Sequence, residues 1–556
     1  MNIINLRPQK RLLAVVSAGF LLVHSAASAD LDASILGNEI PHINPQCYTK
    51  TEDDQGQVHN PCFSCHTDSI RPNYLRDSDL QLAYDFPAPA EENPWKNLFK
   101  DRTTEIAAIS DEEMRSYISE SNYFSQGGEI LPATRLADAP ADWDYNEDGQ
   151  WDGFVPDVWF NFDSEGFDHT PDGSPSGWRA FGYYPFLGTF WPTNGSTDDV
   201  LIRLSEPFRT NLAGDYDSVV YKTNLAIIEA LIRERDIPIE PTDEAALGGI
   251  DLDKDGHIAT AELIKYDWAP REGRFMWYVG QALEEQRAGR LHLAARLYPE
   301  GTEFFHTVRY IDIGEEGTNQ LAARMKEVRY MKKLYWMTYA DLDQRMAAEL
   351  KEKHDFPDRI RPFRGNIESG LGNDQGWVLA AMIEDANGQL RPQTYEELAF
   401  CVGCHSGIGA TTDSTFAFPR HFSTESFQRG WYHWSQKGLR GTPERLREDG
   451  QGDYAFYLAI NGAGDEFREN EEVRARFFDD QGQLKTEMLE ALRQDIAVLL
   501  EASPERAMTL NKAYRVIVQE QSFTQGRDAT VKPASNVHAF VPVGTPTGVA
   551  EPVLGY

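Results

Sequence analysis

Two pentapeptides carry the strongest chemical signal in the chain. They are Cys62-Phe63-Ser64-Cys65-His66 and Cys401-Val402-Gly403-Cys404-His405. Each reads C-x-x-C-H, the pattern in which two thiols attach haem c and the following His binds the iron. Zinc knuckles and redox dithiols also use C-x-x-C, but neither needs a His in the next position. The pattern therefore predicts two covalent haem c groups, with His66 and His405 as the proximal iron ligands.

The N-terminal residues predict export, which covalent haem attachment requires. A basic segment ending at Arg11 precedes an apolar run over residues 12–23, which is too short to span a bilayer. Ala27-Ser28-Ala29 then provides a small-residue cleavage site, so residues 1–29 are predicted to be a signal peptide. There is no Cys near this site and no later apolar stretch of transmembrane length. We therefore expect a soluble periplasmic or extracellular protein, with no lipid at this site and no transmembrane segment.

The charge balance narrows the class of partner. The 556 residues carry a formal net charge of −35 at pH 7. Such a field repels nucleic acid and anionic membranes, and it favours cations and basic proteins. We expect a basic redox partner protein and no nucleic acid, while the oligomeric state stays open.

Four of the five cysteines lie in the two pentapeptides, and Cys47 is the one that remains. If both haems are attached, it has no other thiol in the chain with which to form a disulfide. Three interpretations stay open: a small buried apolar side chain, a distal thiolate ligand of the first haem, or a reactive or crosslinking thiol.

The sixth, distal ligand of each haem iron is not given by the motifs and has to be sought among other residues. His42 is the favoured distal ligand of the first haem, because its tether to Cys62 is long enough to cross the opposite haem face. His306 lies in an apolar stretch and is expected to be internal, as are His421 and His433. A lone His is usually an ordinary polar residue, so these four and Cys47 are candidates only.

Residues 251–262 form the clearest metal-binding loop outside the haem motifs. Acids occupy loop positions 1, 3, 5 and 12, and Gly256 at position 6 allows the sharp turn. The loop resembles those of EF-hand and dockerin-type calcium proteins, a resemblance that implies calcium bound through hard oxygen ligands. The predicted ligands are Asp251, Asp253, Asp255, His257 through its backbone carbonyl, and Glu262. A solvated acidic loop is the alternative.

A second acidic cluster begins in the same way at residue 144. Its predicted calcium ligands are Asp144, Asn146, Asp148 and Asp152. Position 12 of this loop is Val155, so the closing acid is missing. An Asx-rich turn is the competing interpretation.

Hydrophobic patterning predicts a mixed, mainly α fold with loop-rich and short-strand regions, and cytochrome c-like haem segments in a larger multi-domain chain. After the signal peptide we expect a first haem segment (30–131), an aromatic and Gly-rich strand-and-loop region (132–200), a helical region with the calcium loop (201–375), a second haem segment with C-terminal helices (376–518) and an extended tail (519–556). Helices are predicted over residues 111–121, 216–235, 319–354, 485–501 and 504–518, and a strand over 302–313.

The two haem motifs together resemble those of exported dihaem c-type cytochromes. This resemblance implies two haem c groups and a role in electron transfer. The alternative is a dihaem redox enzyme, peroxidase-like or acting on another small molecule, with one substrate-accessible haem; the dihaem peroxidases are the nearest such group, although their motifs usually lie closer together in sequence. A binding module with structural haems is a third option. No recognisable catalytic constellation stands out in the sequence.

Overall fold

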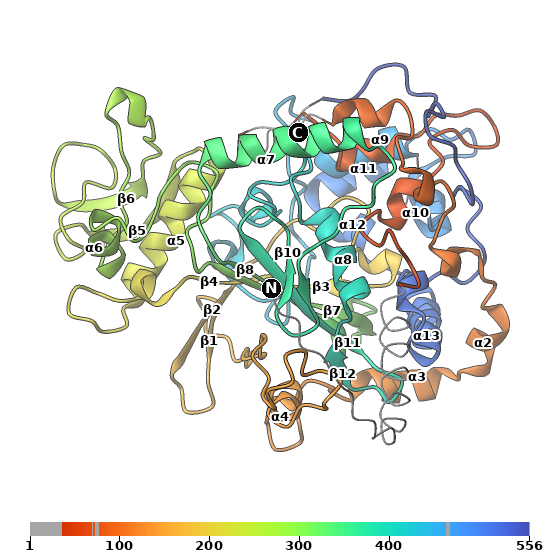
Figure 1. Cartoon of the computed structure of the whole chain (residues 1–556), viewed down its shortest axis with the longest axis horizontal. Helices are drawn as coiled ribbons and strands as arrows, with labels where there is room; N and C mark the ends of the chain where they lie inside the picture. Colours follow the sequence, from red (N-terminus) through yellow and green to blue (C-terminus); the bar gives the residue numbers. More distant parts are fainter. Residues whose placement is uncertain (1–35, 69–70, 73–76, 463–466, 555–556) are drawn as a thin grey trace, which may run out of the picture.

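A computed structural model describes residues 36–68, 71–72, 77–462 and 467–554. The predicted signal peptide lies outside these residues. A large twisted sheet occupies the centre of the molecule, α7 runs along one side of it, and α13 and α3 lie at its other end (Figure 1). The small β5–β6 sheet and α5 form a lobe beside the large sheet.

The central sheet contains ten strands among the described residues, and every neighbouring pair is antiparallel. Its main path runs β1-β2-β4-β7-β8-β11-β10-β9, with β3 added to β7 and β12 to β11. The strands are β1 (Phe167–His169), β2 (Pro175–Ala180), β3 (Thr197–Asp198), β4 (Leu201–Arg203), β7 (Glu303–Ile313), β8 (Asn319–Lys333), β9 (Gly365–Asn366), β10 (Gly370–Gly372), β11 (Trp377–Glu384) and β12 (Leu390–Pro392). A two-stranded sheet is formed by β5 (Ile237–Asp243) and β6 (Thr260–Ile264).

This sheet overturns the prediction of a mainly α fold. The strand predicted over residues 302–313 is confirmed as β7, but the helix predicted over 319–354 is wrong in its first half. Residues 319–333 form β8, which pairs with β7 on one side and with β11 on the other. Most side chains of β8 are buried, so its apolar positions do not alternate with polar ones and their spacing mimics a helix. Only the second half is helical, as α7 (Tyr339–Asp355), which begins at a Thr338 capping box.

Helices surround the sheet and follow their local capping signals. The predictions over 111–121, 216–235 and 504–518 are confirmed as α3, α5 and α13, each with a Ser or Asp side chain that caps the first turn. The helix predicted over 485–501 is interrupted at Asp495, whose extended backbone separates α11 from α12. The helices are α2 (Thr103–Ala108), α3 (Asp111–Ser119), α4 (Leu131–Leu136), α5 (Ser218–Arg233), α6 (Gln281–Arg287), α7, α8 (Tyr395–Cys404), α9 (Asp453–Asn461), α10 (Glu471–Phe477), α11 (Thr486–Gln494), α12 (Ala497–Leu500) and α13 (Pro504–Glu520).

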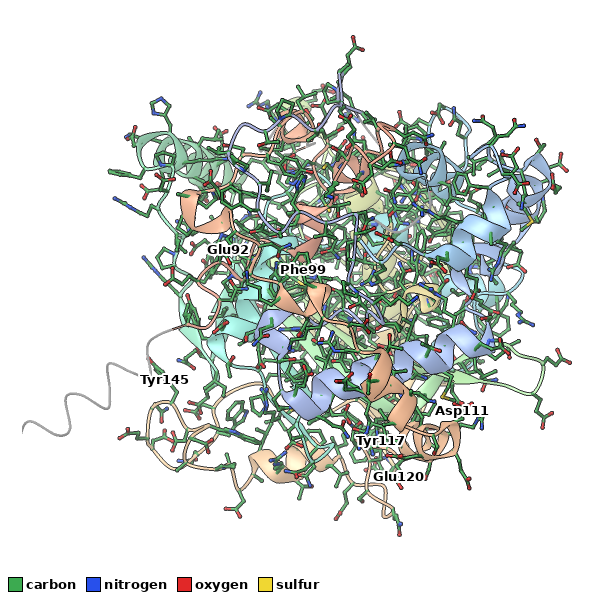
Figure 2. All side chains as sticks on the ribbon, turned by 90° about the vertical axis from the view of Figure 1, so that its right-hand side faces the viewer. Glu92, Phe99, Asp111, Tyr117, Glu120 and Tyr145 are labelled. Atoms are coloured by element: carbon green, nitrogen blue, oxygen red, sulfur yellow. The ribbon has the colours of Figure 1, made fainter. Side chains whose placement is uncertain are left out.

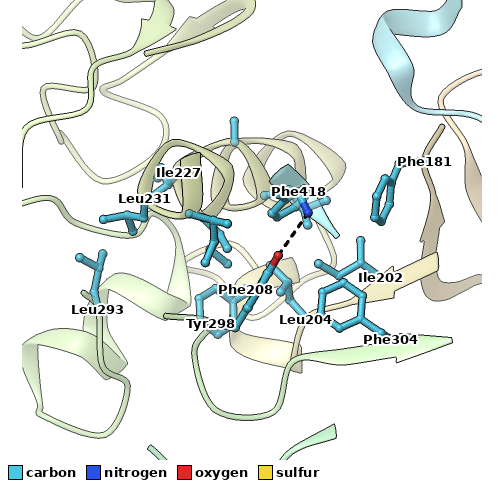
Figure 3. Close-up of a cluster of buried hydrophobic side chains, with 14 of the residues drawn as sticks. Phe181, Ile202, Leu204, Phe208, Ile227, Leu231, Leu293, Tyr298, Phe304 and Phe418 are labelled. Atoms are coloured by element: carbon cyan, nitrogen blue, oxygen red, sulfur yellow. Dashed lines mark hydrogen bonds between the residues drawn. The ribbon is translucent and has the colours of Figure 1, made fainter. Parts of the chain in front are cut away.

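The largest apolar cluster packs α5 against the sheet. Ile202 of β4, Phe304 of β7 and Leu231 of α5 are all buried in it. Tyr298 Oη accepts a hydrogen bond of 3.4 Å from the backbone N–H of Phe418, which ties the second haem segment to this core (Figure 3). Burying one Leu or Phe side chain contributes roughly 1.5–3 kcal/mol, so this cluster holds the sheet and α5 together.

The C-terminal tail folds back onto the first haem segment. Isolated bridges join Thr49 to Val537, Ala83 to Pro546 and Glu92 to Phe540. The tail has no α-helix after α13 in its described part, as expected, although it does contain a 3-10 turn over Phe523–Gln525. The tail and the first haem segment therefore pack together, although they are far apart in the sequence.

Candidate functional site

Both C-x-x-C-H segments line a single cavity of about 730 Å³. Its volume lies within the usual range for small-molecule and cofactor pockets. The first motif reaches it from a 3-10 turn (Pro61–Ser64), and the second from the C-terminal end of α8. The motif residues on its wall are Cys62, Cys65, His66, Cys401, Cys404 and His405.

The floor of this cavity is one face of the central sheet. Three alternate residues of β7 line it, namely Phe304, His306 and Val308. They lie opposite Met331, Arg329 and Glu327 of β8 in the strand register. Alternation within each strand thus places a His and two charged side chains among apolar ones on this floor.

The two motif segments are in direct contact, although they lie far apart in the sequence. The backbone N–H of Ala410 donates to the carbonyl of Cys65 at 3.1 Å. A Cβ atom at Gly409 would lie 2.2 Å from the carbonyl oxygen of Thr67. Glycine therefore permits an approach between these segments that no other residue allows.

The ring of His66 is held by a carboxylate. Its Nδ1 donates to Oδ2 of Asp77 at 2.8 Å, and Asp77 is 4% exposed. Burial lowers the pKa of His66, but hydrogen bonds with Asp77 and Cys47 outweigh it and raise this pKa to about 9. An Nδ1 bound in this way leaves Nε2 as the metal-binding atom, which is the usual arrangement for a His ligand.

The ring of His405 is held in the corresponding way by a carbonyl. Its Nδ1 donates to the backbone oxygen of Ser414 at 3.0 Å. Burial, with a smaller contribution from Arg329, lowers the pKa of His405 to about 4, so the imidazole is neutral near pH 7. Both motif histidines are thus fixed through Nδ1 and can present Nε2.

A buried ion pair positions the Ser414 carbonyl. Nζ of Lys333 donates to Oδ1 of Asp413 at 2.7 Å, and both side chains are fully buried. Oδ2 of Asp413 accepts from the backbone N–H of Tyr298 at 2.9 Å. Asp413 and Ser414 both have positive φ, 49° and 64°, so this turn is held in a left-handed conformation that its contacts must maintain.

The distal candidates separate into two groups. His42, His306 and Cys47 line the cavity. His421 and His433 do not, and both ring nitrogens of each are hydrogen-bonded: His421 to Glu229 and the Gly430 carbonyl, and His433 to Asp199 and Ser435. The geometry therefore favours the first group as iron ligands.

The cavity-lining candidates lie near different motifs. The carbonyl of His42 would lie 2.1 Å from a Cβ atom at Gly403, so His42 adjoins the second motif rather than the first. Cys47 interacts with His66 of the first motif. The buried Nδ1 of His306 has no hydrogen-bond partner in the described part of the chain, and burial together with Arg329 and His405 lowers the pKa of His306 to about 3.

The residues present fit a covalently attached haem. The cavity offers two thiols and one oriented imidazole at each motif, and apolar side chains such as Phe304 and Met331 on its floor. The guanidinium groups of Arg329 and Arg361 also line it and suit the carboxylates of a haem. Sequence reasoning missed the roles of Asp77, Asp413 and Arg329. Of these, only Asp77 could have been found from the sequence near a motif, because it follows His66 by 11 residues.

The predicted calcium loop lies between strands β5 and β6, not between two helices, so the resemblance to an EF-hand ends with the loop. Asp251 and Asp253 gather with Glu244, and one oxygen from each lies within 4.8 Å of the others. Glu244 precedes the loop and was missed; it accepts from the backbone N–H groups of Leu252 at 2.6 Å and Ala259 at 2.8 Å.

The other predicted ligands of this loop lie outside that group. Oδ1 of Asp255 accepts from the backbone N–H of His257 at 2.7 Å, and the His257 side chain is exposed. Glu262 lies on strand β6 with an exposed side chain. Glu244, buried to 1% exposure, is therefore better placed than Glu262 to complete the site.

The second acidic loop has the same backbone arrangement. Glu368, also buried, accepts from the N–H groups of Tyr145 at 3.3 Å and Asp152 at 2.7 Å, which are loop positions 2 and 9, as Leu252 and Ala259 are in the first loop. Position 4 has a φ near 60° in both loops, at Glu147 and Lys254. Tyr145 marks this loop at the edge of the molecule in Figure 2.

The predicted ligands of this second loop are joined mainly through the backbone. Asp144 accepts from the N–H of Gly149 at 2.7 Å, and Asn146 from that of Asp148 at 2.9 Å. The Asn146 amide also donates to Asp152 at 3.3 Å. The loop is thus a well-formed Asx-rich turn with a calcium-loop backbone.

Comparison with known proteins identifies the family. A model described as a “-like lipoprotein” family matches residues 31–496. An uncharacterized lipoprotein of Aquifex aeolicus (strain VF5) is 32% identical, over 91% of this chain and 89% of its own length. The chain belongs to this lipoprotein family. No solved structure matches it.

Membership in the lipoprotein family corrects the resemblance to exported dihaem c-type cytochromes. The family match spans most of the chain, whereas that resemblance was carried by two pentapeptides. A short attachment motif indicates the chemistry of a cofactor, but it does not define the family of the fold around it.

Export, in contrast, agrees with the family. Lipoproteins are exported proteins, so the match supports the signal predicted from the N-terminal residues. Within the described residues, no helix combines the length and apolar character needed to cross a membrane.

Proposed function

We propose that this lipoprotein-family protein binds two covalent haem c groups in one cavity and transfers electrons between redox partners. The observation that carries the proposal is the convergence of both C-x-x-C-H segments on that cavity, each with its His anchored through Nδ1. When bound, haem supplies one-electron chemistry at its iron.

The roles of the motif residues follow from their positions. Cys62 and Cys65 would attach the first haem, and Cys401 and Cys404 the second. His66 and His405 would bind iron through Nε2, while Asp77 and the Ser414 carbonyl hold their rings in place.

The proposed distal ligands are Cys47 for the first haem and His306 for the second. Cys47 already interacts with the His66 ring. His306 has an unpartnered buried nitrogen, and His405 is one of the groups that lower its pKa. His42, which adjoins Gly403, is the alternative for the second haem.

Contact between the motif segments favours electron transfer as the role. The Ala410–Cys65 hydrogen bond holds them together, so two haems attached there would be close neighbours. Close redox centres exchange electrons within one chain. A basic redox protein is the proposed partner, because the net charge is −35.

We also propose a structural calcium ion at the first acidic loop, held by Asp251, Asp253 and Glu244, with Asp255, the His257 carbonyl and Glu262 as the further ligands predicted from the loop pattern. A second ion at Asp144, Asn146, Asp148 and Asp152 is proposed from the matching backbone. Hard oxygen ligands of this kind suit Ca²⁺.

The mature protein is proposed to be soluble in the periplasm or outside the cell. Its first cysteine is Cys47, well after the predicted cleavage site, so no thiol is available there for a lipid. Labelling with a radioactive fatty acid during expression tests this point: incorporation into the mature protein would contradict it.

Spectroscopy and rapid mixing together test the role. An EPR spectrum of the oxidised protein should show low-spin iron at both sites if both sixth ligands are present. The reduced protein should then reoxidise slowly and without new features when mixed with peroxide. A high-spin iron and rapid reoxidation with a high-valent spectrum would favour a peroxidase-like enzyme instead.

A further inference from the structure

Two buried polar side chains, Asp198 and Tyr183, line the cavity beside each other, and each has an oxygen without a hydrogen bond of normal geometry among the described residues. Asp198 of β3 is 5% exposed, and its Oδ1 has no hydrogen-bond partner among the described residues. Oη of Tyr183 is likewise buried and makes no hydrogen bond of normal geometry there. Both residues line the same cavity as the haem motifs. Buried polar groups are normally paired, so each such atom needs an explanation.

Strand pairing brings these groups together on the cavity floor. Asp198 lies opposite Val308 of β7, two residues from His306. His306 lies opposite Arg329 of β8. The Asp198 carboxyl interacts with the hydroxyl of Tyr183 and with the positive charge of Arg329. Strands β3, β7 and β8, and the loop before β3, thus contribute to one polar cluster.

The Arg329 guanidinium has N–H groups that are not used in hydrogen bonds within this cluster. Its Nε donates to Glu327 at 2.9 Å. Its two terminal guanidinium nitrogens have no partner in the part of the chain that the structure describes. Glu327 is already shared with Arg527 at 2.8 Å and Gln393 at 2.9 Å, so its charge is well neutralised. The Arg329 guanidinium lies over the Phe190 ring, 5.0 Å from the ring centroid, and its two terminal nitrogens can still donate to another acceptor.

The chemistry of the cluster is that of a donor site. Burial raises the pKa of Asp198 well above its ordinary value, which favours the protonated form of this carboxyl, the form that can donate. Tyr183 also donates through its hydroxyl, and Arg329 through its cation. The neighbouring Asp199 is occupied by His433 and Thr307. The matching ligand group is one rich in oxygen acceptors.

We infer that Tyr183, Asp198 and Arg329 form a hydrogen-bond-donating pocket for an anionic oxygen group, with His306 at its edge. Two sources share this chemistry: a propionate of a haem, which rests on the proposed function, or a free small oxyanion such as nitrite. Tyr183, Asp198 and Arg329 are not among the thiols and imidazoles that are proposed to hold the haems.

The test uses the full-length protein after its haem content has been measured from the pyridine haemochrome spectrum. Nitrite binding is followed by calorimetry, and haem reduction potentials by redox titration. The variants are Asp198→Ala and Tyr183→Phe, with Tyr184→Phe as control, because Tyr184 does not line the cavity. Asp198→Asn keeps the shape of the side chain and replaces Asp198→Ala if that variant fails to fold.

Each outcome decides the inference. Saturable nitrite binding that weakens at least tenfold in Asp198→Ala and Tyr183→Phe, but not in Tyr184→Phe, supports a free oxyanion. No nitrite binding, but potentials that shift in the same two variants alone, supports a propionate. Neither effect, at full haem content, overturns the pocket. If the wild-type protein contains no haem, the proposed function fails, and nitrite binding to the haem-free protein alone upholds or overturns the pocket.

Discussion

Nδ1 of His66 lies 2.8 Å from Oδ2 of Asp77, a carboxylate that is itself almost fully buried. A carboxylate behind an imidazole fixes the ring and increases the basicity of its other nitrogen. Asp77 is therefore the residue through which the protein would adjust the reduction potential of the first haem.

We predict that Asp77→Asn raises the reduction potential of the first haem. The amide can still accept a hydrogen bond from Nδ1, but it lacks the negative charge that favours the oxidised iron. A tenfold change in a one-electron equilibrium corresponds to about 59 mV, so a shift on the order of tens of mV is expected. Redox titration measures it, with exposed Asp79→Asn as control. Equal potentials in all three proteins would show that Asp77 only packs.

The sequence predicted those features that depend on neighbouring residues and missed those that depend on residues far apart in the chain. The attachment motifs, the capped helices α3, α5 and α13, and strand β7 follow from residues that are neighbours in sequence. β8 was missed because a strand buried on both faces has no alternation, and its partners β7 and β11 lie outside any local window. Glu244 and Asp413 were missed for the same reason: each acts on groups that only the fold brings near.

We predict that Asp413→Ala is strongly destabilising. It leaves the Lys333 ammonium buried without its partner, and breaking a buried pair in this way costs about 3–5 kcal/mol. The free energy of unfolding, measured by urea denaturation, should fall by that amount. The double variant Lys333→Met/Asp413→Ala should recover much of it, because no buried charge remains. If both variants are equally unstable, packing and not charge explains the loss.

Calcium should stabilise the protein through the loop at residues 251–262. Extracellular sites of this kind bind at roughly 10⁻⁴–10⁻³ M. At ten times Kd, one ion adds about 1.4 kcal/mol to the free energy of unfolding, and chelation should lower Tm accordingly. We predict that Glu244→Gln abolishes this calcium dependence.

The matched comparison for the calcium loop is Glu262→Gln. Loss of calcium dependence in both variants would mean that Glu262 also reaches the ion, as the loop pattern predicts. Loss in Glu244→Gln alone would show that Glu244 closes the site. Identical melting of the wild-type protein with calcium and with chelator would reduce the loop to an acidic turn.

Because of the buried Lys326, we predict that the free energy of unfolding rises with pH. It is completely buried, and burial lowers its pKa to about 7 despite the opposing charges of Glu384 and Glu327. The ordinary lysine pKa is about 10.4, so between these two values the unfolded chain binds more protons than the folded one. The free energy of unfolding should therefore rise by a few kcal/mol across this window.

Urea denaturation at several pH values between about 7 and 10 checks this slope. Lys326→Met should remove it, while Lys332→Met, at a half-exposed position beside Glu303, should leave it unchanged. A slope that persists in Lys326→Met would assign the effect to another group.

Intact mass spectrometry of the mature protein tests the central claim most directly. The protein should be produced in a host with working haem-attachment machinery. We predict a mass equal to that of the polypeptide plus two haems, with one addition lost in Cys62→Ala/Cys65→Ala and the other in Cys401→Ala/Cys404→Ala. A wild-type mass matching the bare polypeptide would contradict the account.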